Sequence, residues 1–210
     1  SPDGRHDCRP EYPTIVYTRI LKQLYPDVPV VLGGIEASMR RLTHYDYWVD
    51  KLRPSILVDS GADLLIYGMG EKPITELSHR LSAGEHIRDI RDIPQTAFIA
   101  RHGDKEATPT PDDILLHSHE ECLADKKAEA DNFRHIEEES NKIHAKRILQ
   151  PIGDRCVVVN PPYPPMTTEE LDRSYDLPYT RLPHPKYKNK RIPAYEMIKF
   201  SINTHRGCFG

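Results

Sequence analysis

The sequence predicts an α/β fold built around an open, doubly wound parallel sheet. Apolar runs of strand length alternate with stretches of helical periodicity along the first hundred residues, as expected of parallel strands joined by helices. The runs at 28–32 and 64–67 are each followed by two closely spaced glycines, which permit tight turns after strands. A chain of 210 residues is long enough for one or two domains with a buried core.

The first expected helix begins at Pro13, because proline is favoured in the first turn of a helix. Val16, Ile20 and Leu24 recur at intervals of four residues and form one apolar stripe. We expect this stripe to pack on the sheet.

Strands and helices then alternate. The β-branched run 28–32 is typical of a strand buried on both faces, and it leads into a helix near 36–42. The second strand, 64–67, leads through its glycine turn into a helix over 73–82. A further strand, 96–101, ends in a turn at residues 102–104.

The charged stretch from 110 to about 150 is expected to be helical. Thr110, Pro111 and Asp113 match the N-cap, first and third positions of a helix. Within the stretch, His117, His119 and Cys122 form an H-x-H-x-x-C pattern that suggests zinc. The two histidines would lie on nearly opposite sides of a helix, so we interpret the three as solvated and packed helix residues.

The region from 151 to 193 contains nine of the nineteen prolines and is expected to be extended, semi-rigid chain. It opens with a strand at 155–160, and a capping box at 167–170 predicts one short helix ending near Tyr175. The basic and aromatic stretch 176–191 has some features of a nucleic-acid contact, but we interpret it as a linker wrapping a neighbouring domain.

The last part of the chain is expected to be a strand that runs into a turn. Ile198, Phe200 and Ile202 fall on one side of the segment 196–203, and polar residues fall on the other. The Arg-Gly-Cys run at 206–208 follows directly.

The tail THRGCFG, residues 204–210, resembles the T-H-R-G-C-F-G-G-C run of the YgiQ-type family of radical SAM proteins. In that family three cysteines spaced C-x3-C-x2-C bind a [4Fe-4S] cluster, whose fourth iron is left for S-adenosylmethionine. Cys208 matches the first of the three, and a single thiolate cannot hold the cluster. The resemblance implies that the full-length protein cleaves S-adenosylmethionine reductively to a 5'-deoxyadenosyl radical, which takes hydrogen from an unknown substrate.

The stretch from 25 to 71, beginning YPDVPVVLGGIEASM, resembles the N-terminal region of the same family and the cobalamin-binding-like domain of other radical SAM proteins. The resemblance makes Gly33, Gly34, Gly68, Gly70 and Glu71 the candidate cofactor-binding residues, at the carboxyl ends of two strands. Cobalamin itself is only an analogy, because the D-x-H-x-x-G motif with the metal's histidine ligand is not found.

The resemblance therefore implies an incomplete Rossmann-like, cobalamin-domain-like parallel sheet, followed by a helical and proline-rich connection to the first strand of a radical SAM barrel. We expect the partial Rossmann-like domain at 1–107, the helical connection at 108–150, the proline-rich linker at 151–194 and the start of the barrel at 195–210. Both ends are expected to be excision points from a larger protein. The chain alone is then expected to be inactive and to bind no cofactor, and its partners would be the substrate and the barrel of the same polypeptide.

Composition favours a cytoplasmic protein. The net charge of −3 gives no strong footprint for nucleic acid or membrane surfaces, and the chain lacks an apolar run of membrane-spanning length. The four cysteines, at 8, 122, 156 and 208, are too dispersed for a disulfide framework. An alternative remains open: a non-catalytic small-molecule-binding or interaction module of Rossmann type. Cysteines about four and seven positions beyond Cys208 would favour the enzyme.

Overall fold

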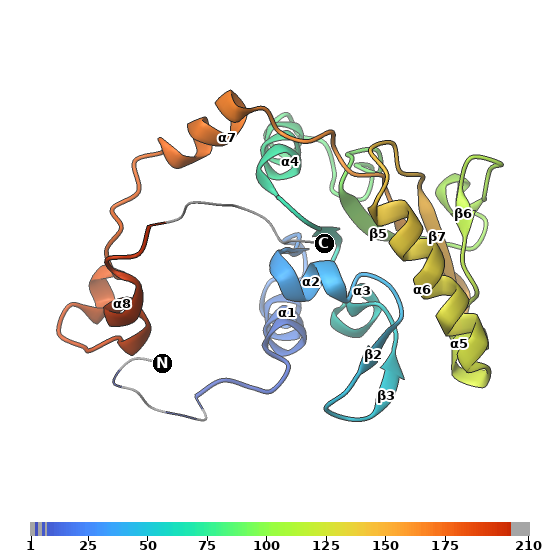
Figure 1. Cartoon of the computed structure of the whole chain (residues 1–210), viewed down its shortest axis with the longest axis horizontal. Coiled ribbons are helices and arrows are strands. Elements are labelled where there is room, and N and C mark those ends of the chain that lie inside the picture. Colours follow the sequence, from blue (N-terminus) through green and yellow to red (C-terminus); the bar gives the residue numbers. More distant parts are fainter. Residues whose placement is uncertain (1–2, 4–5, 7, 203–210) are drawn as a thin grey trace.

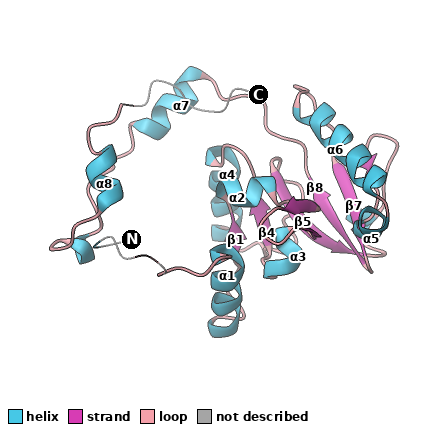
Figure 2. Ribbon diagram, turned by 60° about the horizontal axis from the view of Figure 1, so that its bottom comes forward, coloured by secondary structure: helices cyan, strands magenta, loops and turns pink. Residues whose placement is uncertain are grey.

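The computed structural model describes residues 3, 6 and 8–202, and its centre is a six-stranded sheet with the order β1-β4-β5-β8-β7-β6 (Figures 1 and 2). A separate two-stranded hairpin is formed by β2 (His44–Asp46) and β3 (Lys51–Arg53). The strands of the main sheet are β1 (Val31–Leu32), β4 (Leu64–Ile66), β5 (Thr96–Arg101), β6 (Ile114–Leu115), β7 (Ile148–Ile152) and β8 (Arg155–Val159).

Helices cover both faces of this sheet, because alternate residues of each strand point to opposite sides. On one face Leu65 and Ala97 belong to an apolar cluster with residues of α1, α2, α3 and α6. On the other face Leu64 and Phe98 pack with Leu77 of α4. The helices are α1 (Pro13–Leu24), α2 (Gly34–Met39), α3 (Ile56–Ser60), α4 (Glu71–Ser82), α5 (His119–Ala124), α6 (Lys126–Ser140), α7 (Thr168–Tyr175) and α8 (Pro193–Ile198), with 3-10 turns η2 (Lys105–Ala107) and η3 (Pro185–Tyr187).

The α/β class is confirmed, but the sheet is mixed, and the expectation of parallel strands throughout is wrong. The pairs β1–β4 and β6–β7 are parallel, whereas β4–β5, β5–β8 and β7–β8 are antiparallel. The residues after α4 explain the first reversal: Ile87, Ile90 and Ile93 are buried and pack on the sheet while they carry the chain back to the end of β4. A turn at Gly153, with φ of +54°, joins β7 directly to β8, so these strands must be antiparallel.

Most of the expected elements are present, including α1, β4, α4, β5, β8 and α7. The strand expected at 28–32 is shorter and is limited to β1, and the helix expected near 36–42 is α2. The buried face of α1 differs from the expected one. Ile15 and Thr18 are buried, whereas Val16, Ile20 and Leu24 are exposed. The expected stripe therefore does not pack on the sheet.

The helix expected from 110 to 150 is wrong in its first third. Asp113 does not occupy a helix; its side chain accepts hydrogen bonds from the Thr110 backbone and hydroxyl, and β6 follows. The true N-cap is Ser118, which forms a capping box with Glu121 and starts α5. Residues 148–152 then form β7 rather than helix.

The strand expected at 196–203 is also wrong in the part that the structure describes. Residues 193–198 form the short helix α8, with Pro193 in its first turn. A strand needs a neighbour for its backbone hydrogen bonds, and a single helical turn satisfies these groups locally. Residues 203–210, with Cys208 and the Arg-Gly-Cys run, lie outside the described residues.

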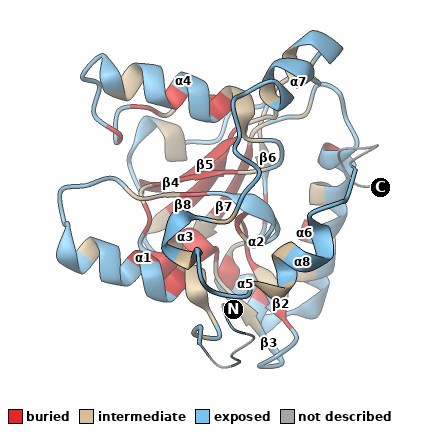
Figure 3. Cartoon of the chain, turned by 90° about the vertical axis from the view of Figure 1, so that its left-hand side faces the viewer, coloured by how far each residue is buried: buried red, intermediate tan, exposed pale blue. Residues whose placement is uncertain are grey.

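The sheet continues across the expected domain boundaries. The boundary at 107 falls between β5 and β6, and the boundary at 150 falls inside β7. Strand β8, placed in the expected proline-rich linker, pairs with β5 and β7 near the middle of the sheet. The chain after β8 leaves the sheet, and neither α7 nor α8 has a buried residue (Figure 3).

Candidate ligand site at the glycine rim

The glycines singled out from the sequence lie together at one edge of the sheet. Strands β1 and β4 are parallel, so the turns at Gly33–Gly34 and at Gly68 and Gly70 meet at their carboxyl ends. They line one open cavity of about 490 Å³ with Glu71, and we call this edge the glycine rim. The predicted placement at the carboxyl ends of two strands is confirmed, whereas the role of these residues in binding a cofactor stays a prediction. The other lining residues are Val31, Leu32, Ile66 and Ile74.

Two of these positions require glycine for conformational reasons. Gly34 has a φ of +85° and Gly68 a φ of +65°, and both lie in the left-handed region that other residues rarely adopt. A Cβ atom added at Gly68 would also lie 3.3 Å from Nε2 of Gln95. The backbone of the rim is therefore left bare where it borders the cavity.

Ser38 ties the two glycine turns together. Its hydroxyl donates to the Gly34 carbonyl at 2.8 Å and accepts the Gly68 N–H at 3.0 Å. Because Ser38 lies on α2, this helix is fixed to the end of β4 as well as to β1. A single serine within a helix carries no sequence signal for such a contact, so the sequence does not predict this role of Ser38.

Gln95 binds the backbone of the second glycine turn. Its side-chain amide donates to the carbonyls of Tyr67 and Met69, at 2.7 and 2.5 Å. The Tyr67 hydroxyl donates to the Asn160 carbonyl at 2.6 Å, and burial raises the pKa of Tyr67 well above its ordinary value. The guanidinium of Arg41 lies 5.0 Å from the centre of the Tyr67 ring. These contacts hold the second glycine turn in one conformation.

Glu71 begins α4, two residues before the start expected at 73, and borders the glycine-rim cavity at the positive end of the helix dipole. It also borders a second cavity of about 470 Å³ between α4 and α7. Across this second cavity Lys72 forms an ion pair with Glu170 at 2.9 Å and lies 5.9 Å from the ring centre of Tyr163. The ion pair joins α7 to α4.

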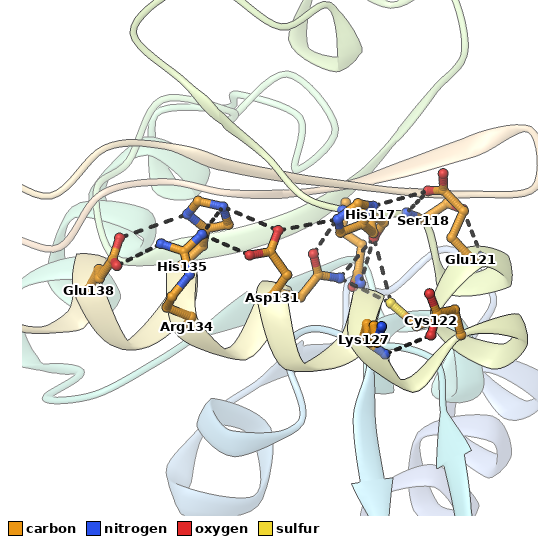
Figure 4. Close-up of polar contacts among 12 residues, drawn as sticks. His117, Ser118, Glu121, Cys122, Lys127, Asp131, Arg134, His135 and Glu138 are labelled. Atoms are coloured by element: carbon orange, nitrogen blue, oxygen red, sulfur yellow. Dashed lines mark hydrogen bonds and ion pairs between the residues drawn. The ribbon is translucent and has the colours of Figure 1, made fainter.

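The histidine and cysteine pattern near 120 is divided between surface and interior, and Figure 4 shows the polar contacts of His117 and Cys122. His117 precedes the helix and lies 3.3 Å from Asp131, at the surface. His119 is buried and lies 3.0 Å from the Thr43 hydroxyl, while Cys122 accepts a hydrogen bond from Asn132. Within the described part of the chain, no group of three or more such side chains is arranged to hold a metal ion.

The described cysteines do not fit an iron–sulfur cluster. Cys8 is exposed, whereas Cys122 and Cys156 are buried in separate elements. Burial raises the pKa of Cys122 to about 12 and that of Cys156 to about 11, so both stay thiols at neutral pH. A cluster needs several thiolates at short intervals. The three described cysteines therefore do not form such a site, and the role of Cys208, which lies outside the described residues, stays a prediction.

The fold and the glycine rim define an α/β module with an open cavity at the edge of its sheet, and a comparison with known families shows which family this module belongs to. Residues 1–201 match the model of the Radical SAM N-terminal family, so the chain belongs to that family. No solved structure matches the chain.

Several curated proteins resemble the chain along its whole length. It is 68% identical to a UPF0313 protein of Bacteroides thetaiotaomicron, 49% identical to one of Geobacter sulfurreducens and 41% identical to the UPF0313 protein YgiQ of Escherichia coli K12. Each alignment covers 100% of this chain but only 34–35% of the relative. The chain thus spans about a third of the length of the curated relatives it matches. No helix among the described residues is long and apolar enough to cross a membrane.

Proposed function

We propose that this chain is the N-terminal module of an enzyme that, as a whole protein, cleaves S-adenosylmethionine reductively with a [4Fe-4S] cluster. The resulting 5'-deoxyadenosyl radical takes hydrogen from a substrate that is not yet identified. The observation that carries the proposal is the match of residues 1–201 to the Radical SAM N-terminal family. Cys208 supplies one thiolate, and the remaining thiolates come from elsewhere in the polypeptide. Dispersed cysteines favour a reducing compartment, so the proposal includes a cytoplasmic location.

In this proposal the glycine rim holds a small molecule or part of a cofactor. Bare backbone at Gly33, Gly34, Gly68 and Gly70 allows close approach, and Glu71 offers a carboxylate beside the cavity. Cobalamin fits poorly, because the sequence lacks the histidine motif that would bind its metal. We expect cobalamin to bind more weakly than micromolar, corresponding to less than about 8 kcal/mol.

A second candidate is a non-catalytic small-molecule-binding module of Rossmann type. The cavity of about 490 Å³ at the carboxyl ends of β1 and β4 favours it, because ligands of open α/β sheets bind at this position. The two candidates differ in whether the whole protein consumes S-adenosylmethionine.

The test uses the whole protein, reconstituted anaerobically with iron and sulfide and supplied with dithionite and S-adenosylmethionine. Mass spectrometry then measures 5'-deoxyadenosine. We expect product from the unmodified protein and from Cys8→Ser, whose thiol is exposed, and none from Cys208→Ser. Equal product from Cys208→Ser would refute the role of Cys208. Absence of product from the unmodified protein, together with saturable ligand binding at the glycine rim, would favour the second candidate.

A further inference from the structure

The segment from 176 to 202, which we call the arm, has no buried residue (Figure 3). It follows α7, contains η3 and α8, and bends away from the sheet (Figure 1). The ion pair between Lys72 and Glu170 joins α7, immediately before the arm, to the folded body. The arm therefore extends from a point of contact with the body and does not pack on the sheet.

The arm is rich in exposed apolar side chains. Tyr179 is 57% exposed, Leu182 68% and Phe200 88%. Single exposed apolar residues are ordinary on a protein surface, but a short segment that exposes many of them marks an interaction site. Further exposed apolar residues of the arm are Leu177, Met197, Ile198 and Ile202.

We infer that the arm packs, through these apolar side chains, against the part of the same polypeptide that follows it in the whole protein. About two thirds of each curated relative lies outside the matched part, so a partner of sufficient size is available. A covalently linked partner is present at a high effective concentration, which favours it over a separate molecule. The inference rests on the proposed function, in which this chain is the N-terminal module of a larger enzyme.

Charge indicates what the partner surface contains. The stretch 181–191 carries five basic residues and no acidic one, so we expect an acidic surface opposite it. Nucleic acid would also be attracted by this positive charge. A nucleic-acid partner would not, however, explain why Met197, Ile198 and Phe200 are exposed. Protein interfaces bury aromatic residues and methionine in this way.

The test is limited proteolysis with trypsin, which cleaves after the basic residues between Arg181 and Arg191. We compare the chain 1–210 with the whole protein. Packing of the arm predicts cleavage that is at least about tenfold slower in the whole protein, because the arm must detach before it is cut. The double variant Tyr179→Ser/Leu182→Ser should restore fast cleavage in the whole protein. Both positions lie in irregular chain, so the substitutions break no helix.

The matched control is the double variant Val28→Ser/Ile143→Ser, which removes two exposed apolar side chains from loops of the folded body. It should retain the protection. Equal cleavage of the arm in the chain 1–210 and in the whole protein overturns the inference. The inference is also overturned if the control variant loses its protection along with the arm variant. Protection that appears only after RNA is added overturns it in favour of nucleic acid. Measuring 5'-deoxyadenosine on the same samples separates the two proposals, because protection without product contradicts only the proposed function.

Discussion

At the scale of single residues, Asp113 and Arg147 form an ion pair in which the carboxylate is buried. Nη2 of Arg147 lies 2.7 Å from Oδ2 of Asp113, and Nε lies 2.9 Å from Oδ1. The Asp113 side chain is only 5% exposed. Arg147 and the hydrogen bonds from Thr110 together lower the pKa of Asp113 to about 2. Asp113 directly precedes β6, and Arg147 directly precedes β7. The ion pair therefore links the starts of these two neighbouring strands.

We predict that Asp113→Asn lowers the unfolding free energy by about 2 kcal/mol at pH 7. Because the pKa of Asp113 is lower in the folded state than its ordinary value of 3.8, the stabilisation is complete above that value and is lost as pH falls toward 2. The difference between Asp113→Asn and the unmodified chain should therefore shrink on acidification. Urea unfolding at several pH values measures it, with the exposed Asp27→Asn as control. A difference independent of pH would contradict the role given to this carboxylate.

Gly68 offers a prediction at the glycine rim. Gly68→Ala places a methyl group 3.3 Å from Gln95 and demands a positive φ of an alanine. Gly84→Ala demands a positive φ as well but meets no atom within 4 Å. Both variants should lose about 1–2 kcal/mol, and Gly68→Ala should lose more. Urea unfolding of the two variants isolates the contact with Gln95, and equal losses would show that the Gln95 side chain moves aside.

At the scale of elements, two capping boxes of the same type make a matched pair. Ser118 and Glu121 start α5, whose His119 and Cys122 are buried in the fold. Thr167 and Glu170 start α7, which has no buried residue. We predict that Ser118→Ala lowers the global unfolding free energy by about 1 kcal/mol. Thr167→Ala should leave the global value unchanged and only accelerate amide hydrogen exchange in α7. A comparable global loss in Thr167→Ala would show that α7 is part of the cooperative core.

Some elements of the fold can be predicted from local sequence patterns alone. The strand β4, the helix α4 and the turn between them follow from local apolar periodicity and glycine, which act within a few residues. The start of α5 also has a local signal, since Ser118 and Glu121 have capping-box spacing, and this signal competes with the N-cap pattern at Thr110. The alternation at 196–202 has no partner strand among the described residues, and the local helix α8 forms instead.

At the scale of the whole molecule, the sequence predicted the α/β class and the glycine rim but not the directions of the strands. The rim depends only on two parallel strands whose glycine turns are visible in the sequence. Strand direction depends on how residues 83–95 cross the sheet, and their buried isoleucines give no signal that distinguishes the two paths. Ser38 and Gln95 support the rim through side-chain contacts between distant segments, which no local pattern encodes.

In the proposed function this chain is one module of a radical SAM protein and contributes a single cysteine to a shared cluster. The most direct test is the iron and acid-labile sulfide bound per polypeptide after anaerobic reconstitution, measured for the chain 1–210 and for the whole protein. We predict essentially no stable cluster in the chain 1–210. In the whole protein we predict about four irons per polypeptide, with broad absorbance at about 400 nm. A stoichiometric cluster in the chain, or none in the whole protein, would contradict the account.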